Sequence, residues 1–216
     1  MSVYNEDPLW LKQSIQSILD QTFEDFEFII VDDGSTNEEN IKFIDKFKKL
    51  DSRIQVFRRK NYGLTKSLNY AISKSSGDII FRQDSDDWSH KKRLQTQISY
   101  LNNNANIILL GLRPVFCQKD GKPLWISKLP LMHQDIVDSL KHMNPFCHGS
   151  VCFRKDLFYK AGKYDENIPV CQDYDLFWRI SNLGKVENID EPFYFLRKTG
   201  LSLSYVKALD QIFYDQ

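Results

Sequence analysis

Hydrophobic residues in the first hundred positions alternate between helical and strand-like spacing. Apolar side chains recur at helical spacing from Leu11 to Leu19, and the run FEFIIVDD that follows is nearly continuous, as in a strand buried on both faces. Two further pairs have the same order: a helix over 41–47 with the strand RIQVFRR, and a helix over 64–72 with the strand DIIFRQ. This alternation predicts an α/β, Rossmann-like fold with a mostly parallel central sheet flanked by helices.

The pattern is looser beyond about residue 105. Short strands are predicted near Ile107 and Val115, with a turn at KDGKP and a helix over 136–140. Neither a repeat nor a low-complexity linker divides the chain, and 216 residues that are 42% hydrophobic can bury the core of one domain. We therefore expect one folded domain.

Charge and cysteine content narrow the class of protein. Lysine and arginine together number 29, as do aspartate and glutamate, so no net charge draws the chain to nucleic acid. The four cysteines lack CxxC spacing and no signal segment precedes them, which predicts reduced thiols in a cytoplasmic protein and argues against a zinc site. The longest apolar run, Ile107 to Leu110, is far shorter than the ~20 residues that cross a bilayer, so the chain is expected to be soluble or peripheral.

Two of the predicted strands end in acidic residues. VDDGS closes one strand and QDSDD another, and because ligands of such sheets bind outside the carboxyl ends of the strands, both clusters are expected at one edge. Each cluster alone is also compatible with a turn or with a helix N-terminus. A calcium loop of the EF-hand type starting at Asp84 does not fit, because it requires glycine and glutamate where Ser89 and Gln95 stand. A phosphatase-type nucleophile is disfavoured, since it usually follows the first strand.

The motifs of the chain resemble those of one enzyme family. In order along the sequence they are SVYNE (2–6), SILDQTFEDFEFIIVDDGS (17–35), NYGLTKSLNYAISKSSGDIIFRQDSDDW (61–88), HGSVCFRK (148–155) and QDYDLFWRI (172–180). They resemble the family 2 inverting glycosyltransferases, which have the A-type nucleotide-sugar transferase fold. The resemblance implies one glycosyltransferase domain over residues 1–205, with a nucleotide-sugar half at about 1–100, an acceptor half at about 101–205, and a C-terminal tail at 206–216 that a truncation could have shortened.

The resemblance implies a donor site for a nucleoside diphosphate sugar. Asp33 matches the family residue that accepts a hydrogen bond from the base, and Asp84 and Asp86 match the D-x-D motif. In that motif the second acid binds a Mg²⁺ or Mn²⁺ ion that bridges the two phosphates, as suits hard carboxylate oxygens. Asp87 is interpreted either as support for that site or as a helix cap. The other residues implied to contact the nucleotide sugar are Tyr4, Glu6, Gly63, Lys66 and Ser85.

The resemblance also implies an acceptor side. Asp173 matches the acid of the family's E/Q-D motif, which is the catalytic base; without the likeness it would be interpreted as an acid at a helix N-terminus. His148, Gly149 and Ser150 occupy a segment that lies near the acceptor in this family.

Two departures from the family pattern accompany the likeness. Only Met1 to Val3 precede YNE, where the family shows several apolar residues, so a central strand is expected to be short, either because the start is misassigned or because the chain is a fragment. Near the end, FLRKTGLSLS has Thr199 where a histidine often supports the metal and the diphosphate. Two alternatives follow: the phosphate site is weaker, or Arg197 and Lys198 substitute for the histidine by charge.

The sequence therefore predicts an inverting glycosyltransferase that moves a sugar from a nucleoside diphosphate sugar, with UDP as the expected nucleotide, to a hydroxyl of a glycan or lipid-linked glycan. The expected process is cell-surface polysaccharide biosynthesis in the cytoplasm, including the inner face of the membrane. One alternative is a sugar-nucleotide-binding module or fragment with impaired catalysis. Another, a metal-dependent nucleotidyl or phosphoryl transferase, would need a basic triphosphate cradle, and the sequence has no glycine-rich P-loop.

Overall fold

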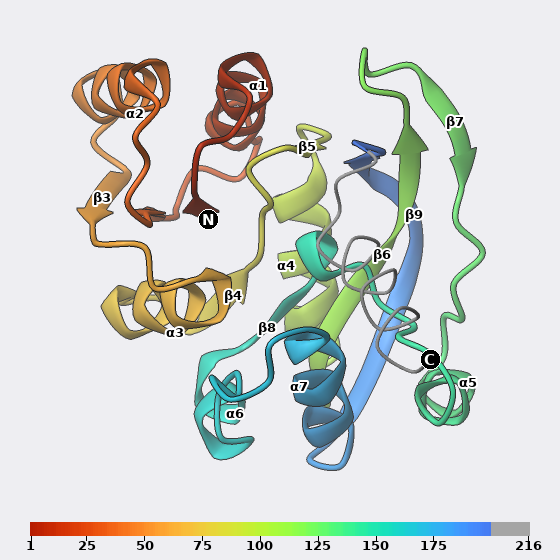
Figure 1. Ribbon diagram of the computed structural model, residues 1–216. Helices are drawn as coiled ribbons and strands as arrows, with labels where there is room; N and C mark the ends of the chain where they lie inside the picture. The colour runs from red at the N-terminus through yellow and green to blue at the C-terminus, as the bar shows by residue number, and fades with distance from the viewer. Residues whose placement is uncertain (200–216) are drawn as a thin grey trace, which may run out of the picture.

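The computed structural model describes residues 1–199, so the predicted boundary at 205 and the tail 206–216 lie outside the described residues (Figure 1). The chain begins with a parallel sheet of three strands, β1 (Ser2–Val3), β2 (Phe28–Asp32) and β3 (Ile54–Arg58), in that spatial order. Ser2 pairs with Val31 and Val3 with Asp32, so β1 covers only the carboxyl-terminal end of β2.

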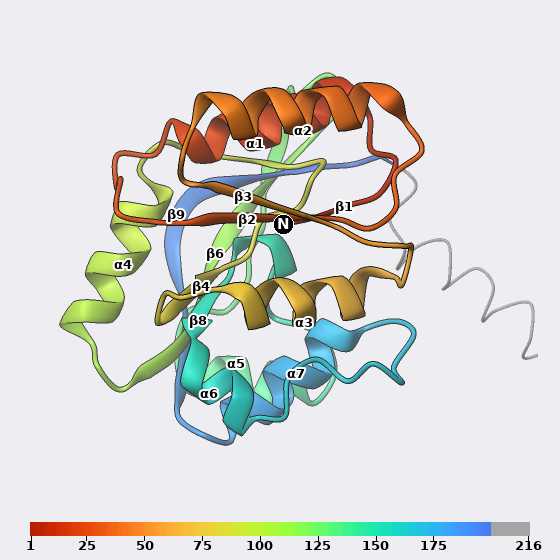
Figure 2. The same cartoon turned by 90° about the vertical axis from the view of Figure 1, so that its left-hand side faces the viewer.

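Three helices cover this first sheet. They are α1 (Pro8–Leu19) and α2 (Glu38–Leu50) on one face and α3 (Leu64–Lys74) on the other (Figure 2). The Asp7 side chain caps α1 by accepting hydrogen bonds from two backbone N–H groups of its first turn, and Asn37 caps α2 in the same way. Apolar side chains on one face of α1 and α2 are buried together with those of β2.

A second, mixed sheet holds the rest of the chain. The long strands β6 (Ile107–Cys117) and β9 (Lys185–Arg197) pair in parallel at its centre, and all its other pairings are antiparallel within residues 1–199. The strand order is β4-β8-β6-β9-β5, with β7 also on β6. The shorter strands are β4 (Ile79–Phe81), β5 (Trp88–Ser89), β7 (Pro123–Ile126) and β8 (Cys152–Arg154).

Four α-helices and one 3₁₀ turn complete the described chain. They are α4 (Arg93–Asn103), α5 (His133–Leu140), η1 (His148–Ser150), α6 (Lys155–Lys160) and α7 (Gln172–Ser181). Buried aromatic and aliphatic side chains of α5, α6 and α7 pack with those of β6 and β8 into the largest apolar cluster. This cluster supports the start of α7 and the η1 turn.

The predicted α/β class and the order of elements over the first hundred residues are confirmed. One difference is that β4 pairs antiparallel with β8 in the mixed sheet and does not extend the parallel one. Local periodicity identifies a strand but cannot identify a partner far along the chain. A second difference is that the strands predicted near Ile107 and Val115 form the single strand β6. Its register against β9 shifts between Leu112 and Pro114, and this irregularity accommodates the proline.

The cysteines are free, as the sequence predicted: Cys117, Cys147 and Cys152 are buried and Cys171 is exposed. Burial raises the pKa of the Cys152 thiol to about 12, so this side chain behaves as an apolar group. Within residues 1–199, no helix has the length and apolar character that crossing a membrane requires.

Candidate active site at the sheet edge

Loops that follow β1, β2 and β4 meet at one edge of the molecule. The backbone N–H of Asp33, directly after β2, donates to the carbonyl of Val3 in β1 at 2.9 Å. The Ser85 hydroxyl, in the loop after β4, donates to Oε2 of Glu6, in the loop after β1, at 2.9 Å. The loop after β1 therefore connects the two acidic clusters of the sequence.

Asp33 is 2% exposed, and both oxygens of its carboxylate bind the segment around the start of α3. Oδ1 accepts from the backbone N–H of Tyr62 at 3.1 Å and from the Ser67 hydroxyl at 2.6 Å. Oδ2 accepts from the backbone N–H of Gly63 at 2.8 Å. Asp33 thus fixes the loop before α3, and the contact with a nucleotide base that the sequence implied stays a prediction.

Glycines allow the same two loops to approach each other. A Cβ atom at Gly34 would lie 2.7 Å from the backbone nitrogen of Asn61, which leaves no room for a side chain. Gly63 is the N-cap of α3 at φ 89°, a left-handed conformation that other residues rarely adopt. Tyr4 is 52% exposed and Lys66 is also exposed, so a ligand at this edge can reach both side chains.

A buried ion pair stands at the beginning of the D-x-D motif. Arg82 is 4% exposed, and its Nη2 atom lies 2.5 Å from Oδ1 of Asp84. Burial alone would raise the pKa of Asp84, but the guanidinium of Arg82 holds that pKa below its ordinary value, with a smaller contribution from His148. Asp84 is therefore ionised and oriented by Arg82.

Asp86 has the opposite electrostatic environment. Burial raises its pKa to about 7, and the negative charges of Asp84 and Glu6 add to the effect. Burial also raises the pKa of Glu6. A divalent cation bound to Asp86 would relieve this repulsion, and carboxylate oxygens are the ligands that Mg²⁺ and Mn²⁺ prefer, so the residues present fit the predicted ion. Within residues 1–199 no group of three or more acids, histidines or cysteines could hold a metal by itself, so phosphates and water would have to supply the other ligands.

Asp87 ties the D-x-D loop to β9. It is 4% exposed, and it accepts hydrogen bonds from the backbone N–H of Arg197 at 2.7 Å and from the Tyr194 hydroxyl at 2.8 Å. Helix α4 begins only at Arg93, so the interpretation of Asp87 as a helix cap is wrong. The Asp87 carboxylate therefore holds the D-x-D loop against β9.

Arg197 braces the same loop. Its Nε donates to the backbone carbonyl of Asp86 at 3.0 Å, and its guanidinium lies 4.9 Å and 4.7 Å from the ring centroids of Trp10 and Trp88. The Lys198 ammonium lies 4.9 Å from the centroid of a tryptophan ring on β7. These contacts argue against the expectation that the two cations substitute for a missing histidine at the diphosphate.

Asp173 lies in the first turn of α7 and is half-buried. The amide of Asn144 donates to its Oδ2 at 2.7 Å. The other carboxylate oxygen accepts no hydrogen bond from residues 1–199, so it can face a ligand. Asp175, in the same helix turn, is paired instead with Arg179, whose Nη2 lies 2.5 Å from its Oδ2.

His148 connects the two ends of the site. Its Nε2 lies 2.8 Å from the Tyr164 hydroxyl. Burial and the charge of Arg82 lower the pKa of His148 to about 4, whereas Asp173 and Asp84 act to raise it. The segment that holds His148 also contacts both acids, since Asn144 binds Asp173 and Gly149 packs on Asp84.

Gly149 and Ser150 are both packed closely against other parts of the protein. A Cβ atom on Gly149 would lie 1.7 Å from the Tyr194 hydroxyl and 2.6 Å from Oδ2 of Asp84, so the D-x-D loop packs directly on this glycine. Ser150 is fully buried, and its hydroxyl donates to the Cys147 carbonyl at 2.9 Å. Its burial counts against the predicted contact between the Ser150 side chain and an acceptor, whereas His148 remains at the site.

Four residues of the site were not found by sequence reasoning: Arg82, Asn144, Tyr164 and Tyr194. Arg82 could have been noticed, because an arginine directly after an apolar strand and before D-x-D needs a buried partner. The others lie in segments without a motif, and only the fold brings them to the acids.

The fold has close structural relatives. Residues 1–349 of TarS from S. aureus, in complex with UDP-GlcNAc, superpose with a TM-score of 0.73 at 18% identity, covering 91% of this chain and 57% of that one. The mannosyltransferase PcManGT from Pyrobaculum calidifontis, in complex with GDP-Man and Mn²⁺, has a TM-score of 0.68 at 15% identity, covering 96% of this chain and 57% of that one. The chain thus has the A-type glycosyltransferase fold, and it spans little more than half the length of PcManGT and of the TarS fragment 1–349.

The chain belongs to Glycosyl transferase family 2, whose model matches residues 1–162. The amylovoran biosynthesis glycosyltransferase AmsE of Erwinia amylovora is 33% identical over 185 residues, which cover 85% of this chain and 69% of AmsE. The predicted family and fold are therefore confirmed. The family match ends before Asp173, so the assignment of the base rests on the position of that residue in the fold and on the QDYD motif.

Proposed function

We propose that the chain is an inverting glycosyltransferase that transfers a sugar from a nucleoside diphosphate sugar, most simply a UDP-sugar, to a hydroxyl of a glycan or lipid-linked glycan. The observation that carries this proposal is that one short segment contacts both acids: Asn144 donates to Oδ2 of Asp173 at 2.7 Å, and a Cβ atom on Gly149 would lie 2.6 Å from Oδ2 of Asp84. This supports a single site with a diphosphate end and an acceptor end. The UDP-GlcNAc bound to TarS and the GDP-Man bound to PcManGT support the class of donor.

The donor lies across the loops after β1, β2 and β4. The base and ribose rest against Tyr4 and the loop that Asp33 holds, with Gly63 and Lys66 above them. The diphosphate lies beside Ser85 and Asp86, and Asp86 would hold a Mg²⁺ or Mn²⁺ ion. When bound, that ion offsets the charge that develops on the leaving diphosphate.

Asp173 is the general base. The acceptor oxygen attacks the anomeric carbon on the face opposite the diphosphate and gives its proton to the free carboxylate oxygen of Asp173. The bond from the anomeric carbon to the diphosphate oxygen breaks, and the diphosphate leaves with the electron pair, which inverts the configuration. Asn144 orients the base through Oδ2.

His148 borders the acceptor. Its lowered pKa keeps the imidazole neutral near pH 7, so it can exchange hydrogen bonds with a sugar hydroxyl without adding a cation beside Arg82. Gly149 acts through the D-x-D loop that packs on it.

We place the enzyme in the cytoplasm, where sugar nucleotides are made, with peripheral contact to the inner face of the membrane. Support comes from β7, whose Leu124, Trp125 and Ile126 side chains are all exposed. The exposed Lys122 and Lys128 lie on either side of this strand in the sequence, and they suit an anionic lipid surface. AmsE, named for the biosynthesis of amylovoran, supports a role in surface polysaccharide assembly.

The test is a melting-temperature screen with UDP-, GDP- and CDP-sugars, each with and without Mn²⁺, followed by sugar transfer and hydrolysis assays. We expect one donor to stabilise the protein more with Mn²⁺ and to be turned over. Stabilisation without any turnover would favour the alternative of a sugar-nucleotide-binding module. No stabilisation by any of these nucleotide sugars would contradict the proposal.

A further inference from the structure

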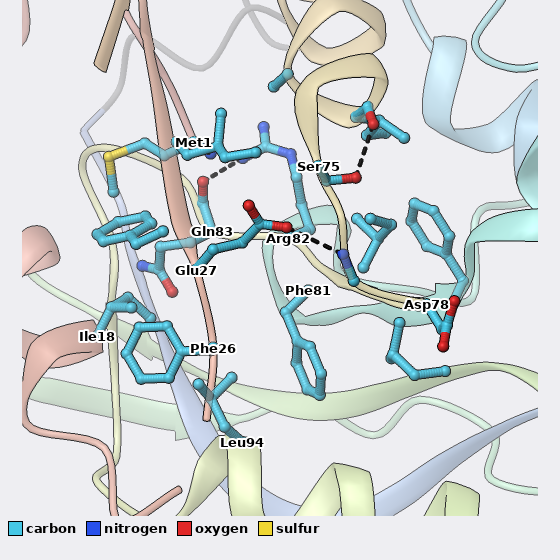
Figure 3. Close-up of a pocket in the computed structure, with 18 of the residues that line it drawn as sticks. Met1, Ile18, Phe26, Glu27, Ser75, Asp78, Phe81, Arg82, Gln83 and Leu94 are labelled. Atoms are coloured by element: carbon cyan, nitrogen blue, oxygen red, sulfur yellow. Dashed lines mark hydrogen bonds between the residues drawn. The ribbon is translucent and has the colours of Figure 1, made fainter. Parts of the chain in front are cut away.

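The loop after β1, residues 4–7, carries two residues of the proposed donor site, Tyr4 and Glu6. β1 alone holds this loop weakly, because the strand has two residues and pairs with β2. Within residues 1–199 no strand pairs with the other side of β1, and Met1 and Arg82 line a cavity of about 620 Å³ between the two sheets (Figure 3). The positions of Tyr4 and Glu6 therefore depend on side-chain contacts of the loop itself.

Asn5, between these two residues, has a backbone conformation that turns the chain. Its φ of 48° lies in the left-handed region, which asparagine, aspartate and glycine adopt more readily than other residues. On one side of this turn Tyr4 is 52% exposed. On the other side Glu6 is half-buried, and its Oε2 accepts a hydrogen bond from the Ser85 hydroxyl at 2.9 Å. The two neighbours of Asn5 thus belong to different ends of the proposed donor site.

The side-chain amide of Asn5 fixes the loop to the segment that precedes α2. Its Oδ1 accepts hydrogen bonds from the backbone N–H groups of Thr36 at 2.8 Å and of Asn37 at 3.0 Å. Its Nδ2 donates to the Thr36 hydroxyl at 3.2 Å, and the backbone N–H of Asn5 donates to the Ser35 hydroxyl at 3.1 Å. Asn5 is therefore joined to residues 35–37, which follow Asp33 in the loop after β2.

Glu6 passes this constraint on to the D-x-D loop. Its backbone carbonyl accepts a hydrogen bond at 3.0 Å from Nδ2 of Asn40, which is fully buried on α2. Its Oε1 accepts from the backbone N–H of Asp7 at 2.9 Å, and its Oε2 accepts from Ser85. Because Ser85 directly precedes Asp86 in the chain, a displaced Glu6 would displace the proposed metal end of the site as well.

We propose that Asn5 is a positioning residue of the donor site: its left-handed conformation and its amide place Tyr4 against the base and, through Glu6 and Ser85, set the position of Asp86. This role rests on the proposed function, because it assigns Asn5 to the donor site described there. A single substitution at Asn5 should therefore weaken both the metal-independent and the metal-dependent part of nucleotide binding, whereas loss of the Asp86 carboxylate should remove only the second part.

Three substitutions separate the conformation of Asn5 from its amide. Asn5→Gly permits the left-handed conformation but removes the amide, and Asn5→Ala removes the amide and strains the backbone. Asn5→Asp keeps an oxygen for the N–H groups of Thr36 and Asn37 and tolerates the same conformation. Asn37→Ala is the matched control, because Asn37 caps the same helix but binds the N–H groups of Glu39 and Asn40 within α2. Since Asn5 is exposed, these changes leave the core intact.

The affinities of these variants for UDP, GDP and CDP, each with and without Mn²⁺, are measured by calorimetry. For the nucleotide that the unmodified protein binds, Asn5→Gly should weaken binding at least ~5-fold without Mn²⁺ and should reduce the gain from Mn²⁺ at least ~3-fold, because small displacements of binding groups are costly. Asn5→Ala should lose at least as much, and Asn5→Asp should stay within ~3-fold of the unmodified protein. Asn37→Ala should lower the melting temperature and leave the affinity unchanged.

Amide exchange distinguishes positioning from direct contact between Asn5 and the nucleotide. The N–H of Asp33 bonds to the carbonyl of Val3 at the end of β1, so its exchange without nucleotide reports how firmly the loop after β1 is held. We expect this exchange to become at least ~10-fold faster in Asn5→Gly and to stay unchanged in Asn37→Ala.

Three results would overturn the role of Asn5 alone: normal nucleotide affinity in Asn5→Gly, an equal loss of affinity in Asn5→Gly and Asn37→Ala, or a loss of affinity in Asn5→Gly with unchanged exchange at Asp33. If the unmodified protein bound none of the three nucleotides, the proposed function would fail, and the role of Asn5 would fail with it.

Discussion

Asp33 and Asp87 accept hydrogen bonds from the protein at both carboxylate oxygens, whereas Asp86 and Asp173 keep oxygens that residues 1–199 leave unused. Asp33 and Asp87 are almost fully buried, whereas Asp86 and Asp173 are partly exposed, on the side of the loops that faces the site. The difference shows that neighbouring acids of one motif, such as Asp86 and Asp87, have different roles. Held acids shape the site, and the proposed roles in metal binding and proton transfer fall to the open acids.

The largest effect is expected at the open acid of α7. Asp173→Asn keeps the size of the side chain but cannot take a proton, so turnover should fall by roughly 10² or more, the usual scale of general-base catalysis, while donor affinity stays near that of the unmodified protein. Steady-state rates and the donor Kd measure both quantities.

Asp175→Asn is the matched control, because Asp175 lies in the same helix turn but pairs with Arg179. Its turnover should stay within about threefold of the unmodified protein, since that pair is away from the reacting atoms. Near-normal turnover in Asp173→Asn, or a greater loss in Asp175→Asn, would show that Asp173 is not the base.

Neighbouring acids of the D-x-D loop should differ in their effect on stability. Asp87→Ala leaves the Tyr194 hydroxyl and the Arg197 N–H without their acceptor, so the free energy of unfolding should fall by about 2–3 kcal/mol. Asp86→Ala removes a charge that its neighbours repel and should leave stability unchanged or slightly higher. Urea unfolding of both variants without metal provides the comparison; equal losses would contradict the division between held and open acids.

Gly149→Ala tests the packing between the η1 turn and the D-x-D loop. The new methyl group would overlap the Tyr194 hydroxyl and Asp84, so a loss of about 1–3 kcal/mol together with weaker donor binding is expected. Gly77→Ala is the control, because its nearest neighbouring atom would be 3.9 Å away. Melting curves and donor titrations suffice, and tolerance of Gly149→Ala would mean that the loop does not depend on this contact.

The smallest effect concerns pH and the amino group of Met1. Its pKa is about 5 in the folded protein against an ordinary value of 8.0, so the unfolded chain binds more protons between these values, and stability from this group is lost as pH falls from 8 to 5. Arg82 and Asp84 are the charged groups that act on it, and fraying of the two-residue β1 should limit the change to about 1 kcal/mol. An N-terminally acetylated protein should lack this component, so the difference between the two pH profiles isolates it. Identical pH profiles of the acetylated and unacetylated proteins would mean that the amino group is exposed to solvent in the folded protein.

Sequence patterns identified much of this molecule because the relevant signals are local. The apolar run of β2, the helical spacing of α1 and the acids after β2 and β4 all follow from spacing within a few residues. The pairing of β4 with β8 and the continuity of β6 could not be predicted in this way, since both depend on partners far along the chain.

The same limit applies to the site. Asp86 and Asp87 are adjacent and chemically identical, yet one is repelled by other acids and the other is bound by Tyr194 and Arg197. Only the approach of β9 distinguishes them. Likewise, Ser150 lies in a motif but turns into the core, and Asn144 lies outside every motif but orients Asp173.

The most direct test of the account is the effect of Mn²⁺ on UDP binding by the unmodified protein and by Asp86→Ala, measured by calorimetry. The account predicts weak binding of UDP to the unmodified protein without metal and at least ~10-fold tighter binding with it, and it predicts that Asp86→Ala retains the weak binding but loses the gain from Mn²⁺. Equal UDP affinity with and without Mn²⁺, or an undiminished gain in Asp86→Ala, would contradict the assignment of Asp86 as the open acid that holds the metal.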